Sequence, residues 1–203
     1  MTGGWSSAPQ KHSRILFNIG GGEAVYFNDI RNFGTVTSAT RGFTAERLWR
    51  LGLDPLGQMN GLVESDFANI VHGLRHRPNL RLAEFLLDQR YVCGIGNYGR
   101  AEILYAARLS PWRPLSRLSP YALDKLRLAI NEIQWASYRA GGASLSSWYA
   151  PDGTRGTFQE QFKVYGRSSC PAGTPVLSQA DFNGRRMWWV PAVQGPYQSG
   201  QCS

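Results

Sequence analysis

Hydrophobic and polar positions follow two different periods along this chain. From Thr44 to about Ala140, apolar residues recur every three or four positions, which is the period of helices that bury one face. Residues 14–37 instead alternate apolar and polar side chains around a glycine turn, as short strands do. The tail is expected to return to strands over 158–165 and 187–190. The pattern therefore predicts an α+β fold, with a helical region between two β regions.

Capping residues place four helix starts within the helical region. Hydroxyl, carboxylate and proline side chains favour the first positions of helices. The predicted starts are Thr44, Ser65-Asp66, Pro78-Asn79 and Ser119-Pro120. The last of these helices is expected to end at Gly141-Gly142, because glycine readily takes the left-handed conformation that closes a helix.

The most informative segment is the glycine-rich turn between two apolar-periodic segments. The first segment carries Leu82, Phe85, Leu86 and Gln89 at helical spacing, and the second carries Ile103, Leu104 and Ala107. Gly94 and Gly96 are expected to allow close backbone approach and positive φ, and Asn97 is expected to cap the second helix. A helix that begins after glycines presents free N–H groups and a positive dipole end, which suits a phosphate.

Composition and charge favour a folded protein with a polyanionic partner. The chain has 203 residues, of which 42% are hydrophobic and 18% charged, as is typical of a globular protein. The 22 Lys and Arg residues against 14 Asp and Glu give a net charge of +8, which favours a polyanionic partner. No apolar run reaches membrane length and no secretory segment opens the chain, so an intracellular protein without a membrane partner is expected. Three widely spaced cysteines give neither a disulfide framework nor a zinc quartet.

Four segments, in order, resemble the formamidopyrimidine-DNA glycosylase / endonuclease VIII family of base-excision-repair enzymes. They are FNDIRNFG (27–34), LLDQRYVCGIGNYGRAEILYAARLSP (86–111), GGASLSSWYAPDGTRGTFQEQFKVYGR (141–167) and GRRMWWVPAVQ (184–194). The resemblance implies a partial N-terminal β-sandwich over 1–43, a helix-two-turn-helix domain over 44–150, and a C-terminal β-hairpin finger over 151–203. It also implies removal of damaged bases from DNA, followed by strand cleavage.

The resemblance also implies roles for particular residues. Asn97, with Gly94 and Gly96 of the same turn, would hold a backbone phosphate near the lesion, and Arg185 would reach the phosphates from the finger. Arg31 and Phe33, together with Met1, would fill the gap that a flipped-out nucleotide leaves.

Each of these residues also has a simpler structural interpretation. Phe33 would then be an ordinary strand aromatic, Arg31 and Arg185 solvated charges, and Asn97 only a helix cap. Glu102 and Asp88 are expected to brace helices and turns and not to act as acids.

The resemblance further implies that the loop over 141–148 lies near the flipped base.

The finger departs from the family's zinc pattern. The family's usual finger binds zinc through two pairs of cysteines, and here only Cys170 matches a ligand position. Val190 and Val193 stand at two of the others. The sequence therefore predicts no metal and no cofactor, and a zincless finger held by the packing of Trp188, Trp189 and Val190.

The residues of catalysis also depart from the family. The resemblance implies an N-terminal proline nucleophile, a neighbouring glutamate and a hairpin lysine, and none is found in this chain. The opening MTGGW resembles an internal segment of the family, so the first region is expected to be a remnant of the β-sandwich. The 203-residue chain is therefore predicted to lack lyase activity, although its family is enzymatic.

The predicted function is damaged-DNA binding by a base-excision-repair DNA glycosylase/AP lyase. The predicted partner is double-stranded DNA with damaged bases or abasic sites, bound by a monomer. Two alternatives stay open: a non-catalytic DNA-binding relative, and an RNA-binding structural protein with a helix-two-turn-helix. Three further questions are open at this point: the preferred lesion, a mis-called gene start of a working enzyme as against a truly truncated protein, and a nuclear as against a cytoplasmic or nucleoid location.

Overall fold

A computed structural model describes residues 3–30, 32, 34–57, 61–144 and 154–195 of the chain. The described residues form two compact units. One contains residues 1–40 and 137–161, and the other contains residues 41–136 and 162–203. The division into three domains expected from the sequence stays a prediction. Across the described residues, none of the helices is both long and apolar enough to cross a bilayer.

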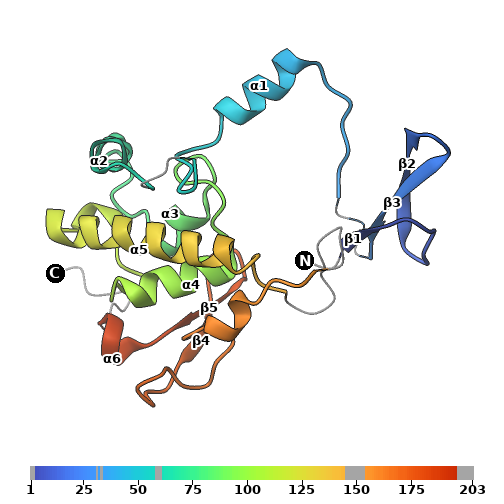
Figure 1. The fold of residues 1–203 in the computed structure, drawn as a ribbon. Helices are drawn as coiled ribbons and strands as arrows, with labels where there is room; N and C mark the ends of the chain where they lie inside the picture. The colour runs from blue at the N-terminus through green and yellow to red at the C-terminus, as the bar shows by residue number, and fades with distance from the viewer. Residues whose placement is uncertain (1–2, 31, 33, 58–60, 145–153, 196–203) are drawn as a thin grey trace. The chain divides into compact units, whose positions relative to one another are not determined.

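The first unit is built on a three-stranded antiparallel sheet (Figure 1). Its strands β1 (Gly3–Ser6), β2 (Ser13–Gly20) and β3 (Glu23–Asp29) lie in the order β1-β3-β2. The expected strands and glycine turn are thus found as far as Asp29, with positive φ at all three turn glycines. The Trp5 ring lies against the rings of Phe17 and Phe27.

The expectation of strands as far as residue 37 was wrong, because β3 ends at Asp29. Beyond β3 the carboxylate of Asp29 accepts hydrogen bonds from the backbone N–H groups of Asn32 and Gly34, at 3.0 and 2.6 Å. These bonds turn the chain out of the sheet. The expected strand over 158–165 was also wrong, because residues Phe158–Gln161 form the short 3-10 helix η2.

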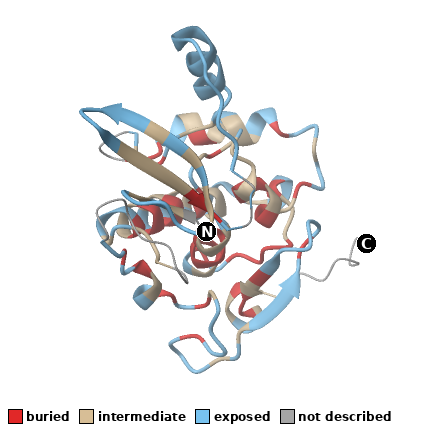
Figure 2. Ribbon diagram, turned by 90° about the vertical axis from the view of Figure 1, so that its right-hand side faces the viewer, coloured by how far each residue is buried: buried red, intermediate tan, exposed pale blue. Residues whose placement is uncertain are grey.

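The second unit is mainly helical (Figure 1). Its elements are α1 (Arg41–Trp49), α2 (Glu64–Gly73), α3 (Leu82–Leu87), α4 (Asn97–Ala106), η1 (Leu115–Arg117), most of α5 (Pro120–Arg139), β4 (Leu177–Ala180), β5 (Arg186–Trp189) and α6 (Pro191–Gln194). Figure 2 shows buried residues gathered in its helices, whereas α1 buries none. The fully buried side chains of the core include Phe67, Leu82, Phe85, Leu86, Ile103, Leu104, Leu126 and Ile130.

The predicted helix starts are confirmed for α2 and α5, which begin at Glu64 and Pro120. Helix α1 begins at Arg41, slightly earlier than expected. The start at Pro78-Asn79 was wrong, because α3 begins only at Leu82 after an extended Arg81. The backbone N–H of Leu82 donates to the carbonyl of Arg113 at 3.0 Å, so a distant segment satisfies the first turn of this helix.

Candidate nucleic-acid interface

The glycine turn leads directly into α4. Gly94 has φ +81°, so the expectation of a positive φ is confirmed there. At Gly96 that expectation was wrong, since its φ is −102°. A Cβ added at Gly96 would meet nothing within 4 Å, and the residue is exposed. Gly94 is thus required by the backbone, whereas Gly96 leaves open space at the start of the helix.

Gln89 holds this turn in shape. Its side-chain Nε2 donates to the carbonyls of Leu87 and Ile95, at 3.1 and 3.0 Å, and its Oε1 accepts from the backbone N–H of Gly94 at 2.8 Å. The sequence placed Gln89 on a helix face, but α3 ends at Leu87. Its amide instead satisfies backbone groups that the turn leaves without helical partners.

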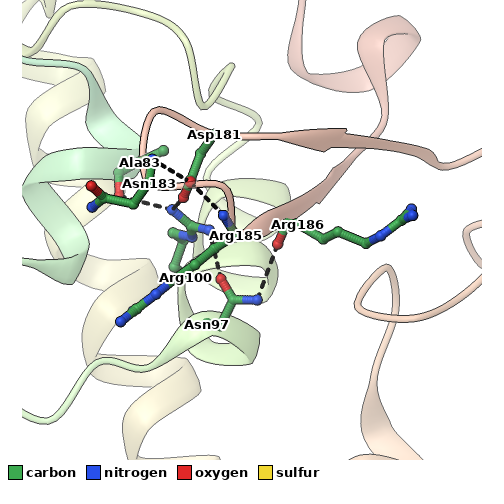
Figure 3. A network of polar contacts seen from close by, with 7 residues as sticks. All are labelled: Ala83, Asn97, Arg100, Asp181, Asn183, Arg185 and Arg186. Carbon is green, nitrogen blue, oxygen red and sulfur yellow. Dashed lines mark hydrogen bonds and ion pairs between the residues drawn. The ribbon is translucent and has the colours of Figure 1, made fainter.

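Asn97 is the first residue of α4, and it does not cap the helix as expected. The N-cap is Gly96, and no side-chain capping bond is formed. The side chain of Asn97 bridges two elements instead (Figure 3). Its Nδ2 donates to the carbonyl of Arg186 at 3.0 Å, and its Oδ1 accepts from Nη2 of Arg100 at 2.5 Å. The start of α4 is therefore tied to the finger strand β5.

The finger is the antiparallel hairpin of β4 and β5, joined by a turn that carries Arg185. The Asn183-Gly184 turn expected from the sequence is confirmed, with φ +70° at Gly184. One carboxylate oxygen of Asp181 accepts from the backbone N–H groups of Asn183 and Arg185, both at 2.9 Å. Arg185 is exposed, and none of the described residues forms a hydrogen bond or ion pair with its guanidinium group. The side chain of Arg186 points away from the network in Figure 3 and donates to Oγ of Ser178 at 3.0 Å.

A buried ion pair joins α4 to the turn of the finger. Nη1 of Arg100 lies 2.6 Å from Oδ2 of Asp181, and both side chains are 0% exposed. Burial lowers the pKa of Arg100, and the hydrogen bond to Asp181 opposes that shift. Burial on its own raises the pKa of Asp181, but the bonds from Arg100 and from the Arg185 and Asn183 amides hold it below the ordinary value. The lowered pKa keeps the carboxylate of Asp181 charged near neutral pH, opposite a guanidinium group of a type that stays protonated in proteins.

Sequence reasoning missed this pair. Asp181 and Arg100 are separated by 81 positions, so no local pattern connects them. The available signal was an arginine three residues after Asn97, on the apolar side of a helix that also carries Leu104. A charged side chain there needs a buried partner.

Glu102 and Asp88 act as braces, as the sequence indicated. Glu102 is 2% exposed, and its carboxylate accepts from the backbone N–H groups of Lys163, Val164 and Tyr165 at 2.9, 3.0 and 2.8 Å. Asp88 follows α3 and accepts from the backbone and guanidinium of Arg90. Hydrogen bonds from Arg90 lower the pKa of Asp88.

Aromatic side chains pack at the base of the finger. Trp189 is buried with its ring 6.2 Å from that of Trp112, and the ring of Trp188 lies 4.4 Å from that of Tyr165. Val190 is 0% exposed, and Cys170 is also buried. Among the described residues, no three His, Cys, Asp or Glu side chains gather in a way that could hold a metal ion. The absence of zinc stays a prediction.

Several predicted site residues lie outside the described residues. These are Met1, Arg31 and Phe33, together with positions 145–148 of the loop expected near the flipped base. Their roles stay predictions. Asp29, from the same motif as Arg31 and Phe33, is described, and it shapes the backbone on both sides of Phe33 through its bonds to Asn32 and Gly34.

A tight glycine turn between two helices, joined to a β-hairpin finger, defines a helix-two-turn-helix protein of the DNA-glycosylase type. Residues 75–148 match the family model described as the formamidopyrimidine-DNA glycosylase H2TH domain. Formamidopyrimidine-DNA glycosylase from Thermus thermophilus is 37% identical over 204 residues, which cover 96% of this chain and 73% of that protein. The corresponding enzyme from Xanthomonas euvesicatoria is 30% identical over 188 residues, covering 92% of this chain and 67% of that protein. This chain therefore belongs to the formamidopyrimidine-DNA glycosylase family, as its motifs indicated.

Solved structures agree with this assignment. The crystal structure of the MutM (Fpg) protein from Thermus thermophilus superposes with a TM-score of 0.84 at 36% identity, covering 98% of this chain and 74% of that one. Lactococcus lactis Fpg, solved in complex with DNA containing an abasic site, has the same fold, with a TM-score of 0.80 at 23% identity. That match covers 97% of this chain and 73% of the Lactococcus protein. The expected α+β fold class is confirmed.

Proposed function

We propose that this chain binds double-stranded DNA at damaged bases or abasic sites, as part of a base-excision-repair glycosylase. The observation that carries the proposal is the meeting of two segments that each offer donors to phosphate. Asn97 at the start of α4 donates to the backbone of β5, and the finger turn that precedes β5 carries Arg185. Because Asn97 and Arg185 belong to one network of contacts, we propose that they bind the same partner (Figure 3).

The chemistry of the site suits a bent phosphate backbone. The Nδ2 group of Asn97 has two N–H bonds, and the carbonyl of Arg186 takes one of them. Gly96 leaves room for a phosphate oxygen to approach the first turn of α4, where the helix dipole favours negative charge. Arg185 adds an exposed guanidinium, whose fork suits phosphate oxygens. The net charge of +8 supports the same partner.

The family motif supports roles for the remaining residues. Arg31 and Phe33, with Met1, fill the space of the flipped nucleotide, because an aromatic ring and a guanidinium replace its stacking and pairing. The finger works without zinc, held by its packed tryptophans. The protein acts as a monomer. Opening the duplex at the lesion exposes the glycosidic bond that glycosylases of this family hydrolyse.

Fluorescence anisotropy with three labelled probes tests this function. The probes are a duplex with a tetrahydrofuran abasic-site analogue, the undamaged duplex, and a structured RNA of equal length. We expect the abasic duplex to bind most tightly, with an affinity that falls steeply as salt rises. Asn97→Ala and Arg185→Ala should each weaken binding by about 1–3 kcal/mol, or about 5- to 150-fold.

A matched control is Arg75→Ala, which removes an exposed arginine outside the network. It should change the affinity much less than Arg185→Ala, although both variants lose one positive charge. If neither Asn97→Ala nor Arg185→Ala weakens binding, the proposed site is wrong. If the RNA binds more tightly than every duplex, the proposed partner is wrong.

A further inference from the structure

The ion pair between Arg100 and Asp181 differs from three other ion pairs among the described residues. Both of its side chains are fully buried, whereas Arg50–Glu46, Arg90–Asp88 and Arg127–Asp124 are at least partly exposed. Burying two charges is costly, and an apolar pair of similar volume is often as stable. The Nε atom of Arg100 is also buried without a hydrogen-bond partner among the described residues. Stability alone therefore gives a weak reason for this pair.

Each member of the pair continues to one of the residues proposed to bind phosphate. Arg100 donates from Nη2 to Oδ1 of Asn97 at 2.5 Å, while its Nη1 pairs with Asp181. Asp181 accepts from the backbone N–H of Arg185 at 2.9 Å. The result is one chain of contacts that runs from Asn97 through Arg100 and Asp181 to Arg185 (Figure 3).

The chemistry of arginine fixes the direction of the Asn97 amide. A guanidinium group has five N–H donors and no acceptor, so only the oxygen of the amide can face it. With Oδ1 turned toward Arg100, the NH₂ group must face the other way, where it reaches the carbonyl of Arg186. The flipped orientation would place two donors together at 2.5 Å and an oxygen against the Arg186 carbonyl. Arg100 thus makes Asn97 present donors, the groups that a phosphate requires.

We propose that Arg100 and Asp181 form a positioning pair that sets the geometry of the DNA phosphate clamp. Arg100 orients the amide of Asn97, and Asp181 shapes the turn that presents Arg185. Neither residue has to touch DNA for this role. The inference rests on the proposed function, since it concerns how the same phosphate-binding site is held.

The test uses Arg100→Lys in the 203-residue chain. Lysine keeps the positive charge opposite Asp181, but its single ammonium group cannot reproduce the planar fork that reaches two partners. The matched control is Arg127→Lys. Arg127 also uses its fork to join a carboxylate to another group, here Asp124 and the carbonyl of Leu62. It lies outside the proposed clamp.

We expect Arg100→Lys to bind the abasic duplex about tenfold more weakly than the wild type at a temperature where both are fully folded. The slope of log affinity against log salt should stay close to that of the wild type, because the lost contact comes from the uncharged Asn97 amide and lysine keeps the positive charge of Arg100. The Asn97→Ala substitution should add little to the loss in Arg100→Lys, since both remove the same contact. Arg127→Lys should bind with the wild-type affinity and slope.

A second measurement needs no DNA. In a ¹⁵N-labelled protein, the two side-chain N–H signals of Asn97 are identified by their loss in Asn97→Ala. In the wild type they should be more widely separated than those of a solvent-exposed asparagine, because one N–H donates to the carbonyl of Arg186, and this extra separation should shrink in Arg100→Lys. If Arg100→Lys does not fold, Asp181→Asn takes its place, paired with Arg185→Ala in the same way.

The outcomes separate the two proposals. Wild-type affinity in Arg100→Lys, or a loss of affinity that multiplies with the loss in Asn97→Ala, overturns the positioning role alone. A wild-type protein that binds none of the duplexes overturns the proposed function and the positioning role together. A fall in thermal stability with unchanged DNA binding assigns the pair to the fold only, and so contradicts the inference.

Discussion

Replacing Glu102 tests whether its carboxylate holds α4 to the segment that precedes the finger. In Glu102→Gln, one oxygen can still accept from the N–H groups of Val164 and Tyr165, as Oε1 does in the wild type. The new NH₂ group, however, faces the N–H of Lys163, so two donors meet where a bond of 2.9 Å existed. A hydrogen bond to a charged group contributes about 1.5–3 kcal/mol. Because Lys163 is exposed and its N–H can turn to water, we expect a loss of about 1–2 kcal/mol.

Glu102→Ala removes the acceptor from all three amides. The N–H of Val164 then has no partner, and Val164 is 0% exposed, so its full desolvation cost applies. Together with the two less buried amides and the lost packing of the side chain, the expected loss is about 3–5 kcal/mol. The expected difference in stability between the two variants follows from the number of hydrogen-bond acceptors that each removes. Charge alone would not separate them, because both lose the negative charge.

Urea unfolding, followed by tryptophan fluorescence, measures these losses of unfolding free energy. The slope of that free energy against urea concentration should be the same in wild type and variants. The control is Glu132→Gln on α5, because Glu132 is exposed and its substitution should change the free energy of unfolding by less than about 0.5 kcal/mol. If Glu102→Gln is as stable as Glu132→Gln, the three amides do not depend on the carboxylate and the reasoning fails. If Glu102→Gln loses as much as Glu102→Ala, the negative charge matters more than the hydrogen bonds.

Further predictions concern the glycine turn before α4, the ion pair between Arg100 and Asp181, the zinc content and the lyase activity. Gly94→Ala should destabilise the fold by about 1–2 kcal/mol because alanine is strained at φ +81°, whereas Gly96→Ala should keep its melting temperature and lose affinity for the abasic duplex. The pKa of Asp181 lies below its ordinary value, so the folded state gains stability from this carboxylate above about pH 4 and loses it as the pH falls through the folded-state pKa. The difference in unfolding free energy between the wild type and Asp181→Asn should therefore become smaller when urea titrations are repeated at acid pH. A difference that becomes larger would show that folding does not lower the pKa of Asp181. Metal analysis of the purified protein should find no stoichiometric zinc, and one zinc per chain would contradict the zincless finger. The 203-residue chain should give no borohydride-trapped adduct with abasic duplex DNA, and a covalent band on a denaturing gel would disprove this.

The sequence was most informative where a local pattern controls the backbone. The helical period located α2 and α5, alternation located β2 and β3, and Asn183-Gly184 located the finger turn. The errors lie where distant segments supply hydrogen bonds. Helix α3 begins at Leu82, not at Pro78, because the segment around Arg113 satisfies its first N–H groups. No local pattern contains that information.

The same distinction explains the candidate site. Motifs in the sequence single out the residues expected to contact DNA, and two of these, Asn97 and Arg185, belong to one network in the structure. The residues that orient them were missed or misplaced: Arg100 and Asp181 were not singled out, and Gln89 was assigned to a helix face. Even the role given to Asn97 as a helix cap was wrong for a tertiary reason. A capping bond would turn its oxygen toward a neutral backbone N–H, whereas the guanidinium of Arg100 offers a charge-assisted bond, which is roughly twice as strong. The stronger donor takes the oxygen, so the NH₂ group faces the carbonyl of Arg186 with one N–H, and the proposed phosphate clamp uses the other.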